Sequence, residues 1–160
     1  MKVLNYNREK ATAYAYRWAL GRNPAYYNFD GLGGDCTNFI SQCIFSGAGV
    51  MNYTPVTGWF YRSADDRTAS WTGVDLLFSF LIENASVGPF GSMCSVNQVC
   101  IGDVIQLGSS EGEYYHSLFV MKISPEIRIA AHTGDALNRS LRSYTYDSIR
   151  CIHIEGVRTW

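Results

Sequence analysis

Near residues 88–92, which read GPFGS, the sequence changes its apolar pattern. Before this point apolar residues recur at helical spacing, as in residues 6–20, YNREKATAYAYRWAL. After it they stand in short β-rich runs divided by turn residues. A chain with helices first and strands later does not alternate strand with helix. We therefore predict an α+β fold, with N-terminal helices packed on a C-terminal antiparallel sheet.

The totals fit one globular domain over residues 1–160. The chain is 47% hydrophobic and 17% charged, which suits a folded protein with its own core. A formal net charge of −1 gives no sign of nucleic acid as a partner. No run approaches the roughly 20 apolar residues of a membrane span, and the residues after Lys2 are too polar for a signal peptide. We expect a cytoplasmic protein or an excised domain of a larger exported one.

The predicted elements follow from periodicity and turn signals. Helices are expected over 6–20, 36–45 and 71–84, the last with Thr72 as its N-cap. Residues 50–70 alternate aromatic and turn residues and are expected to form a long surface excursion. Strands are expected over 98–108, 116–123, 127–133 and 151–157.

Cys36 opens the second predicted helix, directly after Gly33-Gly34-Asp35. In a first helical turn, unpaired backbone N–H groups and the positive end of the helix dipole favour a thiolate, the nucleophilic form of cysteine. The same N–H groups can stabilise the oxyanion of a tetrahedral intermediate, and glycines allow close approach of backbone and substrate. Cys36 is therefore a candidate nucleophile, although the local pattern fits a buried, space-filling cysteine equally well.

The remaining cysteines are expected to be structural. Cys43 stands between Ile40 and Ile44, which is typical of a core position. The five cysteines of the chain provide neither a CxxC pair nor a zinc-like pattern with the histidines. We therefore expect no metal and no organic cofactor.

A nucleophilic thiol needs a base, and two histidines fall in one predicted hairpin. His116 begins HSLFVMKI and His132 ends IRIAAHT, with Ser124-Pro125-Glu126 between the two runs. If these three residues form the loop, His116 faces Gly134, and His132 is a diagonal neighbour on the same face, roughly 6–8 Å away. His116 is then the candidate general base and His132 the group that orients its ring.

Alternatives to this assignment stay open. Taken singly, each of these histidines fits a hydrogen-bonded sheet residue, and His153, between isoleucines, is expected to be structural. Asp135 and Asn138 lie just past the second run, and either could orient His116 in place of His132 if the loop is one residue longer.

Several motifs, in order along the chain, resemble a known family. Asp35-Cys36 after a Tyr- and Gly-rich loop, Gly102-Asp103-Val104 opening a strand, and the placement of His116 and His132 resemble the NlpC/P60 and CHAP-like papain-fold hydrolases. More narrowly, the chain is similar to the putative amidase domain of Gram-positive bacteria. The stretches that carry this similarity cover nearly the whole chain: YNREKATAYAYRWALGRNP, DCTNFISQC, GWFYRS, SWTGV, GDVIQLG and AAHTGDALNR.

The resemblance implies a papain-like fold of NlpC/P60 type and a cysteine amidase or peptidase that passes through a thioester. Cys36 would attack an amide carbonyl. His116 would take the thiol proton and later give it to the leaving amine. His132, or Asp135 in its place, would orient His116.

The wider papain-like class also implies a tyrosine upstream of the nucleophile that assists the oxyanion, here Tyr27 or Tyr26. The chain has DCTN where the NlpC/P60 signature has DCSG, so Asn38 changes the bulk beside the nucleophile. By resemblance the substrate is a peptide or amide linkage, with peptidoglycan-derived peptides of the bacterial cell wall as the first expectation.

Two other functions fit the same sequence. Acyl transfer to an amine would use the same thioester. A catalytically idle module would bind peptides or glycans through aromatic residues, for which the candidates are Tyr53, Trp59, Tyr61 and Trp71. An intact Cys36 with two candidate histidines favours the hydrolase, because a binding module needs neither.

Overall fold

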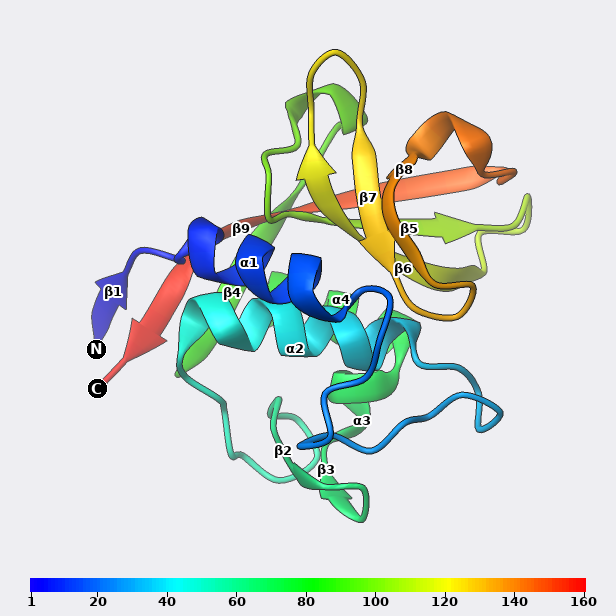
Figure 1. Cartoon of the computed structure of the whole chain (residues 1–160). Helices are drawn as coiled ribbons and strands as arrows, with labels where there is room; N and C mark the ends of the chain where they lie inside the picture. Colours follow the sequence, from blue (N-terminus) through cyan, green and yellow to red (C-terminus); the bar gives the residue numbers. More distant parts are fainter.

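A seven-stranded antiparallel sheet carries helices on one face, so the α+β prediction is confirmed in the computed structural model, which describes residues 1–160 (Figure 1). The helices are α1 (Arg8–Trp18), α2 (Cys36–Ala48), α3 (Ala69–Thr72) and α4 (Val74–Glu83). The strand order is β1 (Lys2–Leu4), β9 (Ser148–Thr159), β5 (Val104–Gly108), β6 (Tyr114–Lys122), β7 (Arg128–Ala131) and β8 (Ala136–Ser140). Strand β4 (Gly88–Cys94) pairs with the other edge of β9.

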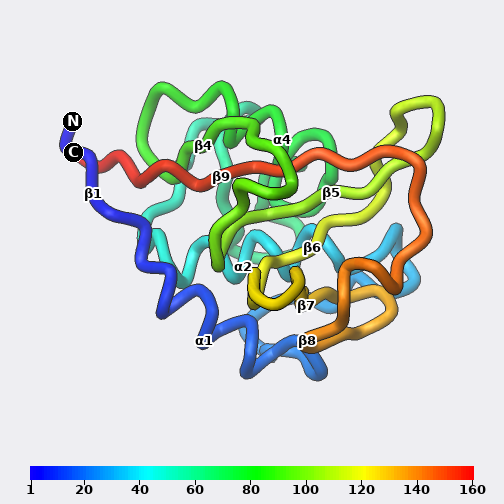
Figure 2. The backbone as a smooth tube through the Cα atoms, turned by 90° about the horizontal axis from the view of Figure 1, so that it is seen from above, coloured from blue at the N-terminus to red at the C-terminus, as the bar shows by residue number.

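The smaller elements complete the chain. Strands β2 (Tyr61–Ser63) and β3 (Asp66–Arg67) form a separate hairpin, and short 3-10 turns span Val96–Gln98 and Leu141–Ser143. Because β1 pairs with the end of β9, the two termini lie side by side (Figure 2). None of the helices has the length and hydropathy that a membrane span requires.

The sheet has a buried cluster on each face. Phe119 and Met121 of β6 point into the larger cluster, which α1, α2 and α4 cover. Leu118 and Val120 of the same strand point into a smaller cluster on the opposite face, beneath β8 and the turn Leu141–Ser143. This alternation follows from the two-residue repeat of a strand and decides which face each β6 side chain occupies.

Helix α1 agrees with its prediction. Its stripe Ala11, Ala15 and Ala19 is fully buried against α2, which lets the two helices approach closely. The helix begins after Asn7, whose side chain accepts a hydrogen bond from the N–H of Lys10 at 3.0 Å.

The third predicted helix, 71–84, is in fact two helices. Thr72 ends α3 instead of capping α4, and Gly73, in an extended conformation, separates the two. The buried residues of α4 are Leu77, Phe80 and Leu81.

The predicted surface excursion over 50–70 is wrong in its centre. Trp59 is fully buried, and Phe60 and Tyr61 are buried beside it. Trp59 packs on Trp71 with ring centroids 4.7 Å apart. Hydrophobic burial of these rings fixes the segment against α2 and α3, whereas the alternation of aromatic and turn residues suggested a surface segment.

Candidate active site

Cys36 is the first residue of α2 and is 7% exposed. Asp35 precedes it at the N-cap but does not cap the helix with its side chain. None of the hydrogen bonds in the structure uses the backbone N–H of Cys36, Thr37 or Asn38. The turn that begins with Cys36 therefore has three donors without a partner in the protein, at the positive end of the helix dipole.

The carboxylate of Asp35 is fully buried and holds the start of α2 in place. It accepts hydrogen bonds from the N–H of Phe29 at 2.9 Å, from Nδ2 of Asn38 at 2.8 Å and from Nδ1 of His132 at 2.6 Å. Burial by itself would raise the pKa of Asp35, but the hydrogen bonds from His132, Asn38 and Phe29 outweigh it and hold this pKa below its usual value. Asp35 is thus an ionised anchor directly before the candidate nucleophile.

His132 is locked on the helix side of the sheet. Its Nε2 lies 2.8 Å from the carbonyl oxygen of Trp18, and its ring stacks on Phe39 with centroids 4.1 Å apart. Its two ring nitrogens thus lie against the Asp35 carboxylate and the Trp18 carbonyl oxygen, and these two contacts fix the orientation of the ring.

The predicted hairpin register is wrong by one residue. Phe119 pairs with Ala130, because a bulge between Val120 and Lys122 adds a residue to β6. A shift of one residue moves side chains to the opposite face. Following this register past the end of β7 places His132 on the face of Ser117, next to α2.

His116 lies on the other face, in line with Leu118 and Val120. Its ring centroid is 5.9 Å from that of Tyr144, and it makes no hydrogen bond to Cys36 or His132. Burial, followed by the nearby charge of Arg139, lowers the pKa of His116. The ring is therefore neutral at neutral pH, the state in which a histidine can take a proton.

One hydrogen bond joins the surroundings of Cys36 and His116. Thr37 Oγ1 lies 3.0 Å from Ser117 Oγ, so the residue after Cys36 contacts the residue after His116. This contact docks the start of α2 on β6, and the ribbon shows α2 packed against the sheet (Figure 1). Sequence reasoning missed Thr37 and Ser117, because neither carries a motif of its own.

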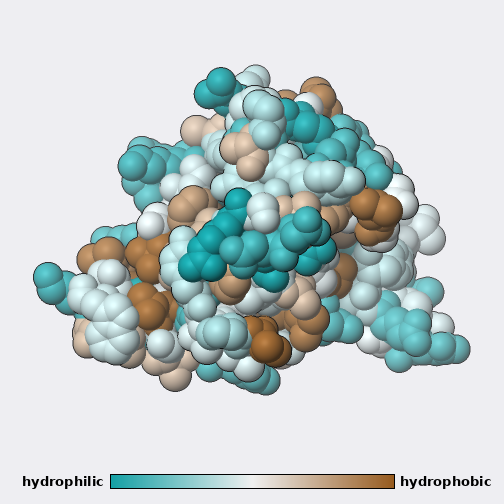
Figure 3. Space-filling model, turned by 90° about the horizontal axis from the view of Figure 1, so that it is seen from below, coloured by the Kyte–Doolittle hydropathy of each residue, from teal (hydrophilic) through white to brown (hydrophobic).

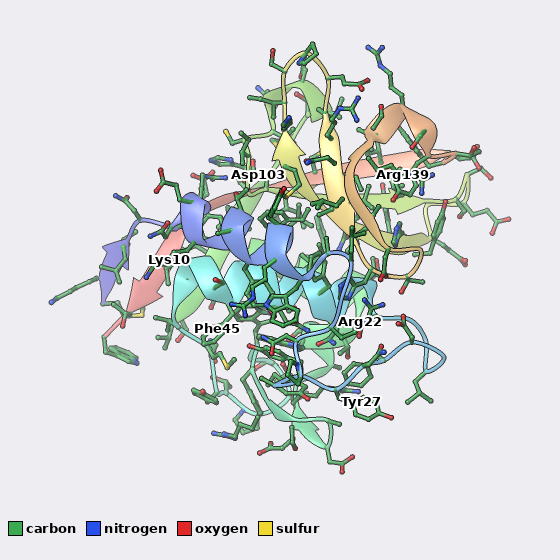
Figure 4. All side chains as sticks on the ribbon, viewed as in Figure 1. Lys10, Arg22, Tyr27, Phe45, Asp103 and Arg139 are labelled. Carbon is green, nitrogen blue, oxygen red and sulfur yellow. The ribbon has the colours of Figure 1, made fainter.

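The other predicted site residues occupy the loops around this point. Asp135 forms a two-pronged ion pair with Arg22, at 2.9 and 3.0 Å, and Arg22 lies at the start of α2 (Figure 4). Tyr27 is 47% exposed and packs on the edge of Phe29. The backbone of Tyr27, and not its phenol, is bound to the site: its carbonyl oxygen accepts from Nδ2 of Asn38 at 3.0 Å.

Asn38, the residue that departs from the NlpC/P60 signature, is fully used inside the protein. Its Nδ2 bonds Tyr27 and Asp35, and its Oδ1 accepts from Nε1 of Trp71 at 3.0 Å. Asp35 and Asn38 are one helical turn apart, and this spacing is the sequence signal that could have paired them. The side chain positions the loop and the N-cap.

A second group of titratable residues lies elsewhere, around Asp103 (Figure 4). Cys100, Asp103 and His153 bring donor atoms within 4.8 Å of one another. The two oxygens of Asp103 already accept from Arg8 at 2.8 Å, from the backbone of Ile154 and Cys100, and from His153 at 2.8 Å. These four bonds occupy the lone pairs of the carboxylate, so the group fits a structural cluster better than a metal site.

The main cavities of the structure lie away from both histidines of the predicted hairpin. One cavity of about 520 Å³ lies between helix α4 and the segment that contains Asn52 and Val56. None of the five main cavities is lined by Cys36, His116 or His132.

Comparisons with known proteins show the family to which the chain belongs. The family described as "Putative amidase domain" matches residues 5–154. The uncharacterized protein YhbB of Bacillus subtilis (strain 168) is 30% identical over 123 residues, which is 75% of this chain. The chain spans only 38% of the length of that relative. No solved structure matches the chain. Because the family match covers nearly all of the sequence, the chain belongs to the putative amidase domain family, whose description is that of an amide hydrolase.

Proposed function

We propose that this protein is a cysteine-dependent amide hydrolase of papain-like, NlpC/P60 type, with Cys36 as its nucleophile. The family description supports amide hydrolysis in general. The observation that carries the cysteine mechanism is the start of α2, where Cys36 shares its helical turn with three backbone N–H groups that no other group of the protein uses. A thiolate and a developing oxyanion need the same donors.

His116 is the proposed general base. It lies one residue from Ser117, which bonds the residue after Cys36, and its lowered pKa keeps it neutral at neutral pH. Sγ of Cys36 has Thr37 Oγ1, at 3.8 Å, as its polar neighbour. Because His116 lies on the opposite face of β6 from Ser117, proton transfer requires the start of β6 to rearrange on substrate binding and bring the His116 ring to the sulfur. Catalytic hydrogen bonds of unliganded enzymes are often long and tighten only in the complex.

The reaction has two halves. Sγ of Cys36 forms a bond to the amide carbonyl carbon, the thiol proton passes to His116, and the oxyanion accepts hydrogen bonds from the first-turn N–H groups. The C–N bond then breaks as His116 gives its proton to the leaving amine, which leaves a thioester. Water attacks the thioester with His116 as base, and the acid and the free thiol are released.

His132 and Asp35 are proposed as positioning residues. Their hydrogen bond fixes the N-cap, and with it the location of Cys36, through further bonds to α1 and to the loop before α2. Asp135 acts one step further out, through Arg22, whose Nε lies 3.6 Å from Asp35. Tyr27 could reach an oxyanion only through its exposed side chain, since its backbone is already engaged.

The substrate is proposed to be a peptide or amide linkage, with cell-wall-type peptides as the first candidates. Acyl transfer to an amine would use the same residues and differ only in the second acceptor. The idle binding module loses support, because Trp59, Tyr61 and Trp71 are buried. On the face shown in Figure 3, apolar side chains form separate spots and not one continuous patch.

The test is to incubate the protein with purified muropeptides and a panel of simple amides and to identify products by mass spectrometry. Wild type should release an amine and an acid from at least one substrate, and Cys36→Ala should release neither while unfolding at a similar temperature. Turnover by Cys36→Ala would reject the thiol mechanism. Products that carry a new amide bond would favour acyl transfer over hydrolysis.

A further inference from the structure

We propose that a chain of hydrogen bonds, directed from donor to acceptor, runs through the interior from Arg150 to Cys36 and stabilises the thiolate of Cys36. Its intermediate members are Gln106, Ser117 and Thr37. The inference rests on the proposed function in one respect, because it takes Cys36 as the nucleophile.

The chain is continuous and buried. Nε of Arg150 lies 2.7 Å from Oε1 of Gln106, and Nε2 of Gln106 lies 3.1 Å from Oγ of Ser117. Ser117 Oγ and Thr37 Oγ1 are 3.0 Å apart, and Thr37 Oγ1 lies 3.8 Å from Sγ of Cys36. Gln106 and Ser117 are fully buried and Thr37 is 1% exposed. Solvent therefore does not compete for the bonds that join these three residues.

The direction of the first two bonds follows from chemistry. A guanidinium only donates, so the side-chain oxygen of Gln106 must face Arg150. The amide nitrogen of Gln106 then has two protons, and one goes to the carbonyl oxygen of Val74 at 2.9 Å, which only accepts. The other proton goes to Ser117. Both neighbours thus fix the same orientation of the amide.

The hydroxyl groups continue in the same direction. Oγ of Ser117 accepts from Gln106, so its single proton is free to be donated to Thr37. Thr37 accepts that bond, which leaves its own proton for the sulfur of Cys36. Each donor in the chain of hydrogen bonds then points toward the sulfur. Because the chain begins at the Arg150 cation and ends at the Cys36 thiolate, each bond polarises the next and strengthens it.

Arg150, at the end of the hydrogen-bond chain away from Cys36, is held by several contacts. Arg150 donates to Asp75 at 2.7 Å, and its guanidinium lies 3.9 Å from the ring centroids of both Phe78 and Tyr114. Burying polar atoms costs free energy that an apolar side chain at Gln106 or Ser117 would not cost. The presence of three buried polar residues, Gln106, Ser117 and Thr37, therefore favours a role beyond packing.

The test is the pH dependence of Cys36 alkylation by iodoacetamide, followed on the Cys36 peptide by mass spectrometry. Thr37→Val removes the last hydroxyl with little change of shape, and Ser117→Ala breaks the chain one bond earlier. The titratable groups that face the start of α2, which are Arg22, Asp35 and His132, stay unchanged in both variants, as does the proposed base His116.

Thr37→Val should move the pH midpoint of alkylation up by about one unit, the change that loss of one hydrogen bond to a charged group produces. Ser117→Ala should move it less, in the same direction, and Thr37→Ser should restore the wild-type midpoint. Arg150→Met, at the other end of the chain of hydrogen bonds, should also raise the pH midpoint. This variant tests the proposal if Thr37→Val fails to fold.

Ser41→Ala is the matched control, because it also removes a buried hydroxyl of α2, one that bonds Trp71 and Trp59. It should lower stability without moving the midpoint. Midpoints of Thr37→Val and Ser117→Ala within about 0.2 unit of wild type would overturn the proposal. The alkylation assay needs no substrate, so it is independent of the turnover assay. It can reject the hydrogen-bond chain while Cys36 proves catalytic, and it can support the chain while no amide turnover is found.

Discussion

Replacing His132 with phenylalanine tests the role of the buried pair that His132 forms with Asp35. The new ring can still stack on Phe39, where the imidazole centroid now lies 4.1 Å away. The two hydrogen bonds of His132, to Asp35 at 2.6 Å and to the Trp18 carbonyl at 2.8 Å, are both lost. The variant therefore separates the polar contribution of His132 from its packing.

The expected loss is about 3 kcal/mol of unfolding free energy. A hydrogen bond to a charged group is worth about 1.5–3 kcal/mol and a neutral one about 0.5–1.5 kcal/mol. The loss stays near the middle of the summed range, because Asp35 keeps its bonds from Asn38 and Phe29 and the nearby Arg22 and is not left unpaired. For a chain of this size the melting temperature should fall by about 6–12 °C.

Thermal unfolding, followed by tryptophan fluorescence at pH 7, measures this change. His116→Phe is the matched control, because His116 is half-buried but makes no hydrogen bond in the structure, so it should cost less than about 1 kcal/mol. Equal losses for the two variants would refute the assignment of His132 as the residue that anchors the N-cap.

The same pair makes a pH prediction. Because the pKa of Asp35 is lower in the folded protein than its usual value, its contribution is complete above the unfolded value of about 3.9 and is lost as pH falls through the folded value. The stability gap between wild type and His132→Phe should therefore close in acid. A gap that stays constant down to pH 2 would contradict the ionised state of Asp35.

Three further predictions concern the nucleophile, the base and the loop. Cys36→Ala and His116→Ala should each abolish turnover while leaving the melting temperature within a few degrees of wild type, as checked by activity and calorimetry. Burial and Arg139 lower the pKa of His116, so the acidic limb of the pH profile of kcat/KM should lie below about pH 6.5. Arg139→Gln should move this limb to higher pH. A limb above pH 7 would exclude His116 as the base. Gly34→Ala should cost about 1–3 kcal/mol in urea unfolding, because Gly34 has φ +94° and an added Cβ would lie 3.2 Å from Thr133 Oγ1.

The sequence was informative where a pattern is local. Helical spacing identified α1 and α2, glycine and aspartate before Cys36 identified the helix start, and β-rich runs identified β5, β6, β7 and β9. Strand β4 was missed, because the glycines of GPFGS indicate a turn but in fact allow close pairing: a Cβ on Gly91 would lie 2.5 Å from the carbonyl oxygen of His153.

The candidate site was harder to predict, since it depends on a register that one bulge changes. The extra residue in β6 near Met121 moves His132 from the face of His116 to that of Ser117. No sequence pattern marks this bulge. The buried polar partners Thr37, Ser117 and Gln106 could not be found either, because their pairing needs three elements to meet in space.

The most direct measurement is to trap the thioester. The protein is mixed with a substrate from the muropeptide and amide panel, quenched in acid within the first turnover and digested for mass spectrometry. The account predicts an acyl mass on the peptide that contains Cys36, removable by hydroxylamine and not formed by Cys36→Ala. Turnover with an acyl group on another cysteine, or with the Cys36 peptide never modified, would contradict it.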